Sequence, residues 1–187
     1  MRVETRSRSV VEAVGIVLRR MPSEARKKVE EFVTVVRADR DFHMLGLGGI
    51  DPTSAMLAPT WKSLSDIGST NYNAQIVVTL PIFKLSSAKS QIGIVAHEFG
   101  HAWRASQFGK GWHEYMQTRH AAEERLADDW SQRWGFEDNI KIMRDERRRI
   151  VNPLLEEQEP VIMRRILDQA RRQQEKMRSL IANENNP

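Results

Sequence analysis

The chain of 187 residues contains no cysteine. This absence excludes disulfide bonds and zinc sites with thiolate ligands. It also excludes the form of protease latency in which a cysteine coordinates the catalytic metal ion. It also fits a reducing compartment, where disulfide bonds are rare. A zinc site in this chain would use histidine and carboxylate ligands instead.

The sequence also lacks an apolar run long enough to cross a bilayer, which takes about 20 residues. The longest candidate, residues 10–18, follows a basic N-terminus but is interrupted by Glu12 and followed by Arg19 and Arg20. No small-residue cleavage site of a signal peptide follows it. We therefore interpret this run as part of an amphipathic helix and expect a soluble, cytoplasmic protein.

The most informative motif is His97-Glu98-Phe99-Gly100-His101. Two histidines four residues apart on a helix project about 40° from each other around its axis, so both imidazoles can reach one metal ion. A catalytic zinc ion takes neutral histidine nitrogens and keeps one position for water. Glu98 would accept a proton from that water as it attacks a carbonyl group.

The residues around the motif predict a helix that begins after Ser86 or Ser87 and ends before Gly109. Its apolar stripe consists of Ile92, Val95, Phe99 and Ala102. The alternative interpretation is an ordinary amphipathic helix whose two histidines lie on the surface or in the core. The glutamate between the histidines favours a metal site over this alternative.

The third metal ligand is predicted from a second helix further along the chain. A third histidine at the metzincin offsets is excluded, because Arg104 and Gln107 occupy the places of the required Gly and His. Glu124 and Asp128 lie four residues apart, so a ligand and a second acid share one helix face. Asp128 would accept the other ring N–H of a metal-bound histidine and so orient it. His113 and His120 are competing third ligands.

At this point the sequence resembles a known family, the prenyl-protease and HtpX-like branch of the gluzincin metallopeptidases. The resemblance extends from Asn73 to Phe136 and has three parts in the family's order. These parts are Asn73-Ala74 with Ile76-Val77-Val78-Thr79, Leu85-Ser86 with Val95-Ala96-His97-Glu98-Phe99-Gly100-His101, and Glu124-Arg125-Leu126-Ala127-Asp128 with Gly135-Phe136. The resemblance implies that Glu124, rather than Glu123, is the zinc ligand. Members of that branch usually carry membrane helices, so membrane substrates are not carried over to this chain.

The predicted fold is α+β, with a zincin-like core that spans residues 41–140. This core would contain a small, mostly antiparallel sheet with an edge strand, the active-site helix and the ligand-bearing helix. Residues 1–40 are predicted as an N-terminal helical segment with two helices that break near Met21-Pro22. Residues 141–187 are predicted as a basic helical extension.

The predicted function is zinc-dependent hydrolysis of peptide bonds, with Glu98 as the general base. Cobalt or manganese could replace Zn²⁺ at a His-His-Glu site. An oxyanion donor is also needed, and His120 and Tyr115 are favoured over His113 and Arg119. The run from Gln75 to Leu80 predicts an edge strand along which an extended peptide or protein substrate would bind.

A different role is suggested by residues 141–178, which hold eleven Lys or Arg against seven Asp or Glu. Clustered arginines such as Arg147-Arg148-Arg149 attract phosphate, so the basic helices could bind nucleic acid or a protein partner. The interleaved acids favour a solvated helical face instead. A third possibility is a latent protease whose terminal helices cover the cleft.

Overall fold

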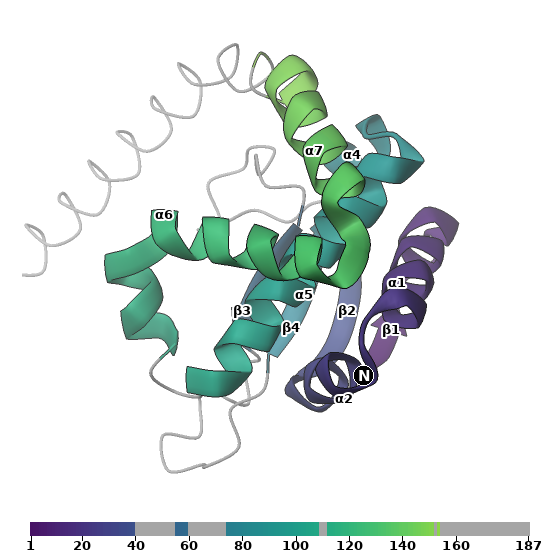
Figure 1. Ribbon diagram of the computed structural model, residues 1–187. Helices are drawn as coiled ribbons and strands as arrows, with labels where there is room; N and C mark the ends of the chain where they lie inside the picture. Colours follow the sequence, from purple (N-terminus) through teal and green to yellow (C-terminus); the bar gives the residue numbers. More distant parts are fainter. Residues whose placement is uncertain (40–54, 60–73, 109–111, 152, 154–187) are drawn as a thin grey trace, which may run out of the picture.

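The computed structural model describes residues 1–39, 55–59, 74–108, 112–151 and 153, and it is mostly helical with one small sheet (Figure 1). The elements in chain order are β1 (Arg2–Glu4), α1 (Arg8–Arg20), α2 (Ser23–Phe32), β2 (Val33–Asp39), β3 (Ala55–Pro59), β4 (Ala74–Thr79), α4 (Leu80–Leu85), α5 (Ala88–Phe108), α6 (Trp112–Ser131), η3 (Gln132–Phe136), α7 (Glu137–Glu146) and η4 (Arg147–Val151). The predicted mixture of helices and a sheet is therefore confirmed.

The sheet has the strand order β1-β2-β4-β3, and its first two pairings are parallel. The prediction of a mostly antiparallel sheet was therefore wrong. Helices α1 and α2 separate β1 from β2, so the chain can return to run in the same direction, as parallel pairing requires. The predicted second helix also ends earlier than expected, at Phe32. The run Val33-Thr34-Val35-Val36 is rich in β-branched residues, which favour a strand.

The predicted strand near residues 75–80 is present as β4, but its predicted place at the edge of the sheet was wrong. Strand β4 pairs with β2 on one side and with β3 on the other. Ile76, for example, lies opposite both Val36 and Leu57, so the hydrogen-bonding groups on both sides of β4 serve neighbouring strands. In the described part of the sheet, β1 and β3 are the edge strands.

The hydrophobic core lies between the sheet and the helices, which stand in front of the sheet in Figure 1. Val36 and Ile76 of the sheet, Val17 of α1 and Phe99 of α5 are all at most 1 % exposed. The predicted N-terminal segment 1–40 therefore supplies two strands and two helices to the same core as the motif helix. The predicted divisions at residues 40 and 141 stay predictions.

The beginning of α5 is fixed by two side chains. The Ser87 hydroxyl accepts a hydrogen bond from the backbone N–H of Ser90 at 3.3 Å, which identifies Ser87 as the cap predicted at Ser86 or Ser87. The Ser87 backbone N–H donates to Oε2 of Glu146 in α7 at 2.9 Å. Burial acts to raise the pKa of Glu146, but hydrogen bonds from Ser87 and Ser90 outweigh it and lower the pKa below its ordinary value.

Helix α7 also packs closely against the first half of α5. A Cβ atom at Gly93 would lie 2.4 Å from the backbone oxygen of Asn139, so only glycine permits this approach. The Asn139 side-chain amide donates to the backbone oxygen of Lys89 at 3.0 Å. Helix α7 is therefore tied to α5 near its beginning by Asn139 and at its end by Glu146.

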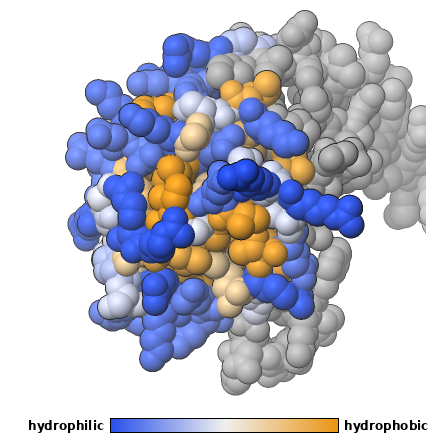
Figure 2. Space-filling model, turned by 90° about the vertical axis from the view of Figure 1, so that its right-hand side faces the viewer, coloured by the Kyte–Doolittle hydropathy of each residue, from blue (hydrophilic) through white to orange (hydrophobic). Residues whose placement is uncertain are grey.

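Figure 2 views the molecule from the side of α1 and shows apolar groups gathered in the middle of this face, with polar side chains around them. The exposed large apolar residues among those described are Val11, Leu85 and Phe108. Among the described residues, no helix is both long enough and apolar enough to cross a membrane.

Candidate metal centre

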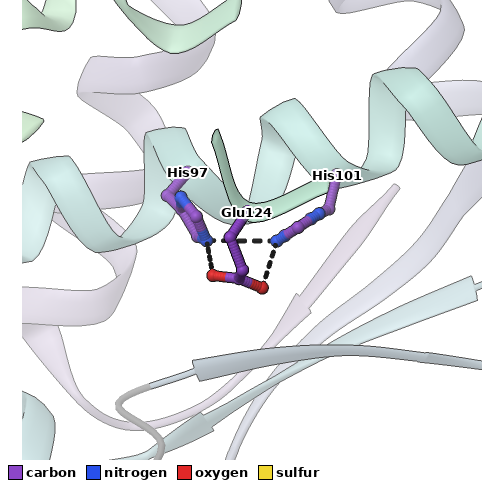
Figure 3. Close-up of side chains that lie close together, drawn as sticks. All are labelled: His97, His101 and Glu124. Atoms are coloured by element: carbon purple, nitrogen blue, oxygen red, sulfur yellow. Dashed lines mark hydrogen bonds and ion pairs between the residues drawn. The ribbon is translucent and has the colours of Figure 1, made fainter. Parts of the chain in front are cut away.

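Three side chains converge between α5 and α6, and we name His97, His101 and Glu124 together the candidate metal centre. The Nε2 atoms of His97 and His101 lie 3.1 Å apart. The Glu124 carboxylate faces both rings, with Oε2 at 3.2 Å from Nε2 of His97 and Oε1 at 3.2 Å from Nε2 of His101 (Figure 3). One ligand atom from each residue lies within 4.8 Å of the others, so the group can hold one metal ion.

The candidate metal centre is partly shielded from water. The side chain of His101 is 6 % exposed, that of His97 12 % and that of Glu124 36 %. Burial acts to raise the pKa of Glu124, but hydrogen bonds from His101 and His97, together with their charge, hold it well below its ordinary value. Glu124 is therefore ionised at neutral pH, as a carboxylate ligand must be.

Asp128 orients the first histidine, as the sequence predicts. Its Oδ1 atom lies 2.7 Å from Nδ1 of His97, and its side chain is 3 % exposed. With a metal ion bound, a proton on Nδ1 donated to this carboxylate would leave the Nε2 lone pair of His97 for the ion. The other Asp128 oxygen, Oδ2, forms an ion pair with Arg144 of α7.

The two ligand-bearing helices touch through backbone atoms. A Cβ atom at Gly100 would lie 2.4 Å from the carbonyl oxygen of Ala127, well inside van der Waals contact. The Ser131 hydroxyl on α6 donates to the backbone oxygen of Ala96 on α5 at 2.7 Å. Because the helices approach so closely here, the short Glu124 side chain reaches both histidines.

The adjacent glutamate has a different partner. Glu123 is completely buried, and its Oε1 atom accepts a hydrogen bond of 2.7 Å from Nε of Arg104 on α5. A second contact of 3.4 Å joins Nη2 of Arg104 to Oε2. Arg104 therefore holds Glu123, while Glu124 faces the histidines. This arrangement agrees with the ligand that the family resemblance implies.

We predict that Arg104→Met lowers the free energy of unfolding by about 2–3 kcal/mol. The substitution leaves the Glu123 carboxylate buried without its guanidinium partner. The loss is below that of a fully enclosed pair because the Arg104 side chain is 20 % exposed. Urea unfolding of the metal-free protein measures it. The double variant Arg104→Met/Glu123→Leu should recover most of the loss, and a single variant as stable as wild type would contradict the prediction.

The predicted catalytic residues differ in how far the structure describes them. Glu98 lies on α5 and is 6 % exposed, and its side chain takes part in none of the hydrogen bonds or ion pairs found among the described residues. Tyr115 and His120 lie on α6, as do His113 and Arg119, but their side chains fall outside the described part of the structure. Their predicted roles as oxyanion donors or third ligands therefore stay predictions.

Two charged residues beside the candidate metal centre were not predicted from sequence, namely Arg104 and Arg144. Arg144 follows Asp128 by sixteen residues, and the chain turns between them at Gly135, whose φ of 86° and ψ of 24° are left-handed. No spacing rule predicts which residue after such a turn will return to the site.

The basic cluster Arg147-Arg148-Arg149 is exposed on η4, next to α7. Arg148 is paired with Asp145 at 2.6 Å, so part of its charge is already compensated. The rest of the predicted basic extension, residues 154–187, lies outside the described residues. The binding of nucleic acid or a protein partner by these helices stays a prediction.

Comparisons with protein families, curated proteins and solved structures find no match to this chain. The resemblance to the prenyl-protease and HtpX-like gluzincins therefore stays a prediction. The geometry of the candidate metal centre is the observation that bears on function.

Proposed function

We propose that the protein is a zinc-dependent endopeptidase of the gluzincin type, in which α5, α6 and the sheet form a zincin-like core. His97, His101 and Glu124 would hold the zinc ion, and Glu98 would act as general base. The observation that carries the proposal is the convergence of three ligand atoms. Two imidazole Nε2 atoms come from α5, the helix that bears the buried Glu98, and the carboxylate comes from α6.

The donor set suits zinc. Two imidazole nitrogens and one carboxylate oxygen are ligands that zinc prefers, and three protein ligands are typical of catalytic rather than structural zinc sites. The ionised state of Glu124 and the hydrogen bond between His97 and Asp128 both favour a bound cation. Cobalt and manganese also accept such ligands, so the proposal of zinc follows from ligand type.

A zinc ion bound there would supply Lewis acidity to a peptide carbonyl group and make water a stronger acid. The residues of the chain would do the rest. Glu98 would accept a proton from the attacking water, hold it on its carboxylate and deliver it to the leaving amine. Asp128 would keep the His97 ring in one tautomer and orientation. His120 and Tyr115 are the proposed donors to the oxyanion.

The proposed substrate is an extended peptide or an unfolded protein segment. Since β4 is paired on both sides, an added strand would pair with β3, which contacts α5 and has one partner among the described strands. Backbone hydrogen bonds to such an edge strand provide affinity for many sequences. This proposal replaces the predicted docking along residues 75–80.

We predict that the purified chain binds one zinc ion and cleaves an unfolded protein such as casein only when the metal is present. Treatment with EDTA should abolish cleavage, and added Zn²⁺ should restore it. Glu124→Gln should weaken zinc binding by more than about 100-fold, because it removes a ligand rather than a supporting residue. Glu137→Gln, at an exposed position on α7, is the matched control. Cleavage that persists without metal would contradict the proposal.

Removal of residues 1–40 would not be a test of the latent-protease alternative. That truncation deletes β1 and β2, and β2 is the strand that pairs with β4. Truncation at residue 141 cuts α7 and removes Arg144. Both changes would damage the fold or the site, so a loss of activity after truncation would not count against latency.

A further inference from the structure

We propose that Arg144 is a positioning residue of the metal centre and acts on His97 through Asp128. This inference rests on the proposed function, because it assumes that the candidate metal centre holds a metal ion. It adds a residue of α7 to a site otherwise made by α5 and α6.

The Asp128 carboxylate has a hydrogen-bonding partner at one oxygen and an ion-pair partner at the other. Oδ1 lies 2.7 Å from Nδ1 of His97, and Oδ2 forms the ion pair with Nη2 of Arg144. The Asp128 side chain is 3 % exposed, so water does little to hold or screen it. The direction of the carboxylate is therefore set by His97 on one side and by Arg144 on the other.

This two-point attachment has a consequence for the histidine. A carboxylate held at one oxygen can turn about its Cβ–Cγ bond, whereas one held at both oxygens cannot turn without losing a partner. The plane of the Asp128 carboxylate fixes the N–H direction of His97 and hence the direction of Nε2. Arg144 also compensates a buried negative charge, which is costly when it is left with too few partners.

Arg144 lies on α7, and the position of this helix is fixed at both ends. Asn139 ties the beginning of α7 to the backbone of Lys89, and Glu146 ties its end to the backbone of Ser87. Both anchoring points lie on or directly before α5, the helix that carries His97. Arg144 is therefore held in a fixed position relative to α5, which carries His97.

The ion pair of Arg144 differs from an ordinary surface pair in the burial of its acid. Arg148 and Asp145, on the same stretch of chain, are both well exposed, at 70 % and 47 % of their side chains. Such pairs contribute little to stability. Arg144 is half exposed, at 51 %, but its partner is nearly inaccessible. Arg148 therefore offers a matched control, because it is another arginine–aspartate pair without a link to the site.

The test compares the affinity for Zn²⁺ of the full-length wild type, Arg144→Met, Arg144→Lys and Arg148→Met, by competition with a chromophoric chelator. We expect Arg144→Met to weaken zinc binding about tenfold, as for other residues that support a metal ligand. Arg144→Lys keeps the charge without the guanidinium fork, so its affinity should lie between those of Arg144→Met and wild type. Arg148→Met should bind as wild type. The visible spectrum of the Co²⁺-loaded protein should change in Arg144→Met and not in Arg148→Met.

A second measurement tests whether the effect passes through Asp128. In the Asp128→Asn background, Arg144→Met should cause no further loss of zinc affinity. An equal loss of zinc affinity in both backgrounds would overturn the role of Arg144 and leave the metal centre intact. So would an Arg144→Met protein that binds zinc as tightly as wild type while Glu124→Gln loses it. A wild-type chain that binds no zinc would instead overturn the proposed function. If Arg144→Met alone does not fold, Arg144→Lys, which keeps the charge, takes its place in both backgrounds.

Discussion

Replacement of Glu98 by Gln is expected to slow peptide hydrolysis by about 10²–10⁴-fold and to leave zinc binding unchanged. Glutamine has nearly the same shape as glutamate, but its amide cannot accept the proton of the attacking water. Glu98 is not among the three proposed ligands, so the metal content should be preserved. The measurement is the initial rate of cleavage of an unfolded protein by the two zinc-loaded proteins at equal metal content.

The control for this experiment is Glu137→Gln, which makes the same chemical change at an exposed position of α7. It should cleave at the rate of wild type. If Glu98→Gln also cleaves at that rate, Glu98 is not the base. If wild type and variant are both inert although zinc is bound, the peptidase proposal gives way to latency, narrow specificity or a binding role.

The second large effect is expected at Gly100, where alanine should lower the free energy of unfolding by about 3–4 kcal/mol. The added Cβ atom would overlap the carbonyl oxygen of Ala127, and it would also lie 3.0 Å from the Ala127 carbonyl carbon and Cα atom. All three contacts are with backbone, so α5 and α6 must move apart. Glu124 lies one turn before Ala127, so this movement also carries the carboxylate away from His101 and weakens zinc binding. Urea unfolding and zinc competition measure the two effects separately.

Gly15 of α1 provides the matched control for this substitution. A Cβ atom there would meet the flexible end of Arg19, at 3.3 Å from Nη1. Gly15→Ala should therefore be neutral or stabilising by up to about 1 kcal/mol, since alanine favours a helix more than glycine does. If Gly100→Ala proves as stable as Gly15→Ala, the helices are not in backbone contact near the metal centre.

The parts of the site that sequence analysis predicted depend on local spacing. The four-residue separations of His97 from His101 and of Glu124 from Asp128 fix which side chains share a helix face. The cap at Ser87 is also local, because it depends on one residue and on the backbone N–H groups that follow it. These signals depend on neighbouring residues only, so they can be recognised without knowledge of the rest of the fold.

The parts that it missed depend on how the elements pack. The partner of Glu123 lies nineteen residues away on another helix, and only the packing of α5 on α6 brings Arg104 to it. The wrong position of β4 has a similar cause. The sequence predicts a helix where β2 lies, so the pairing of β2 with β4 could not be predicted from it. An apolar stripe of Val29, Phe32, Val33 and Val36 fits a helical period, although the adjacent β-branched residues favour a strand.

The anchoring of α7 on α5 also determines when the site can form during synthesis. A nascent chain that has emerged as far as α5 carries His97 and His101 but not the glutamate that completes the three ligands. Asp128 follows four residues after Glu124, and Arg144 is translated later still, after the turn at Gly135. Helical contacts between neighbouring segments form quickly, whereas β2 must wait for its partner β4, which is translated about forty residues later. The two histidines are thus synthesised first, and Asp128 and Arg144, which hold His97 in place, are synthesised last.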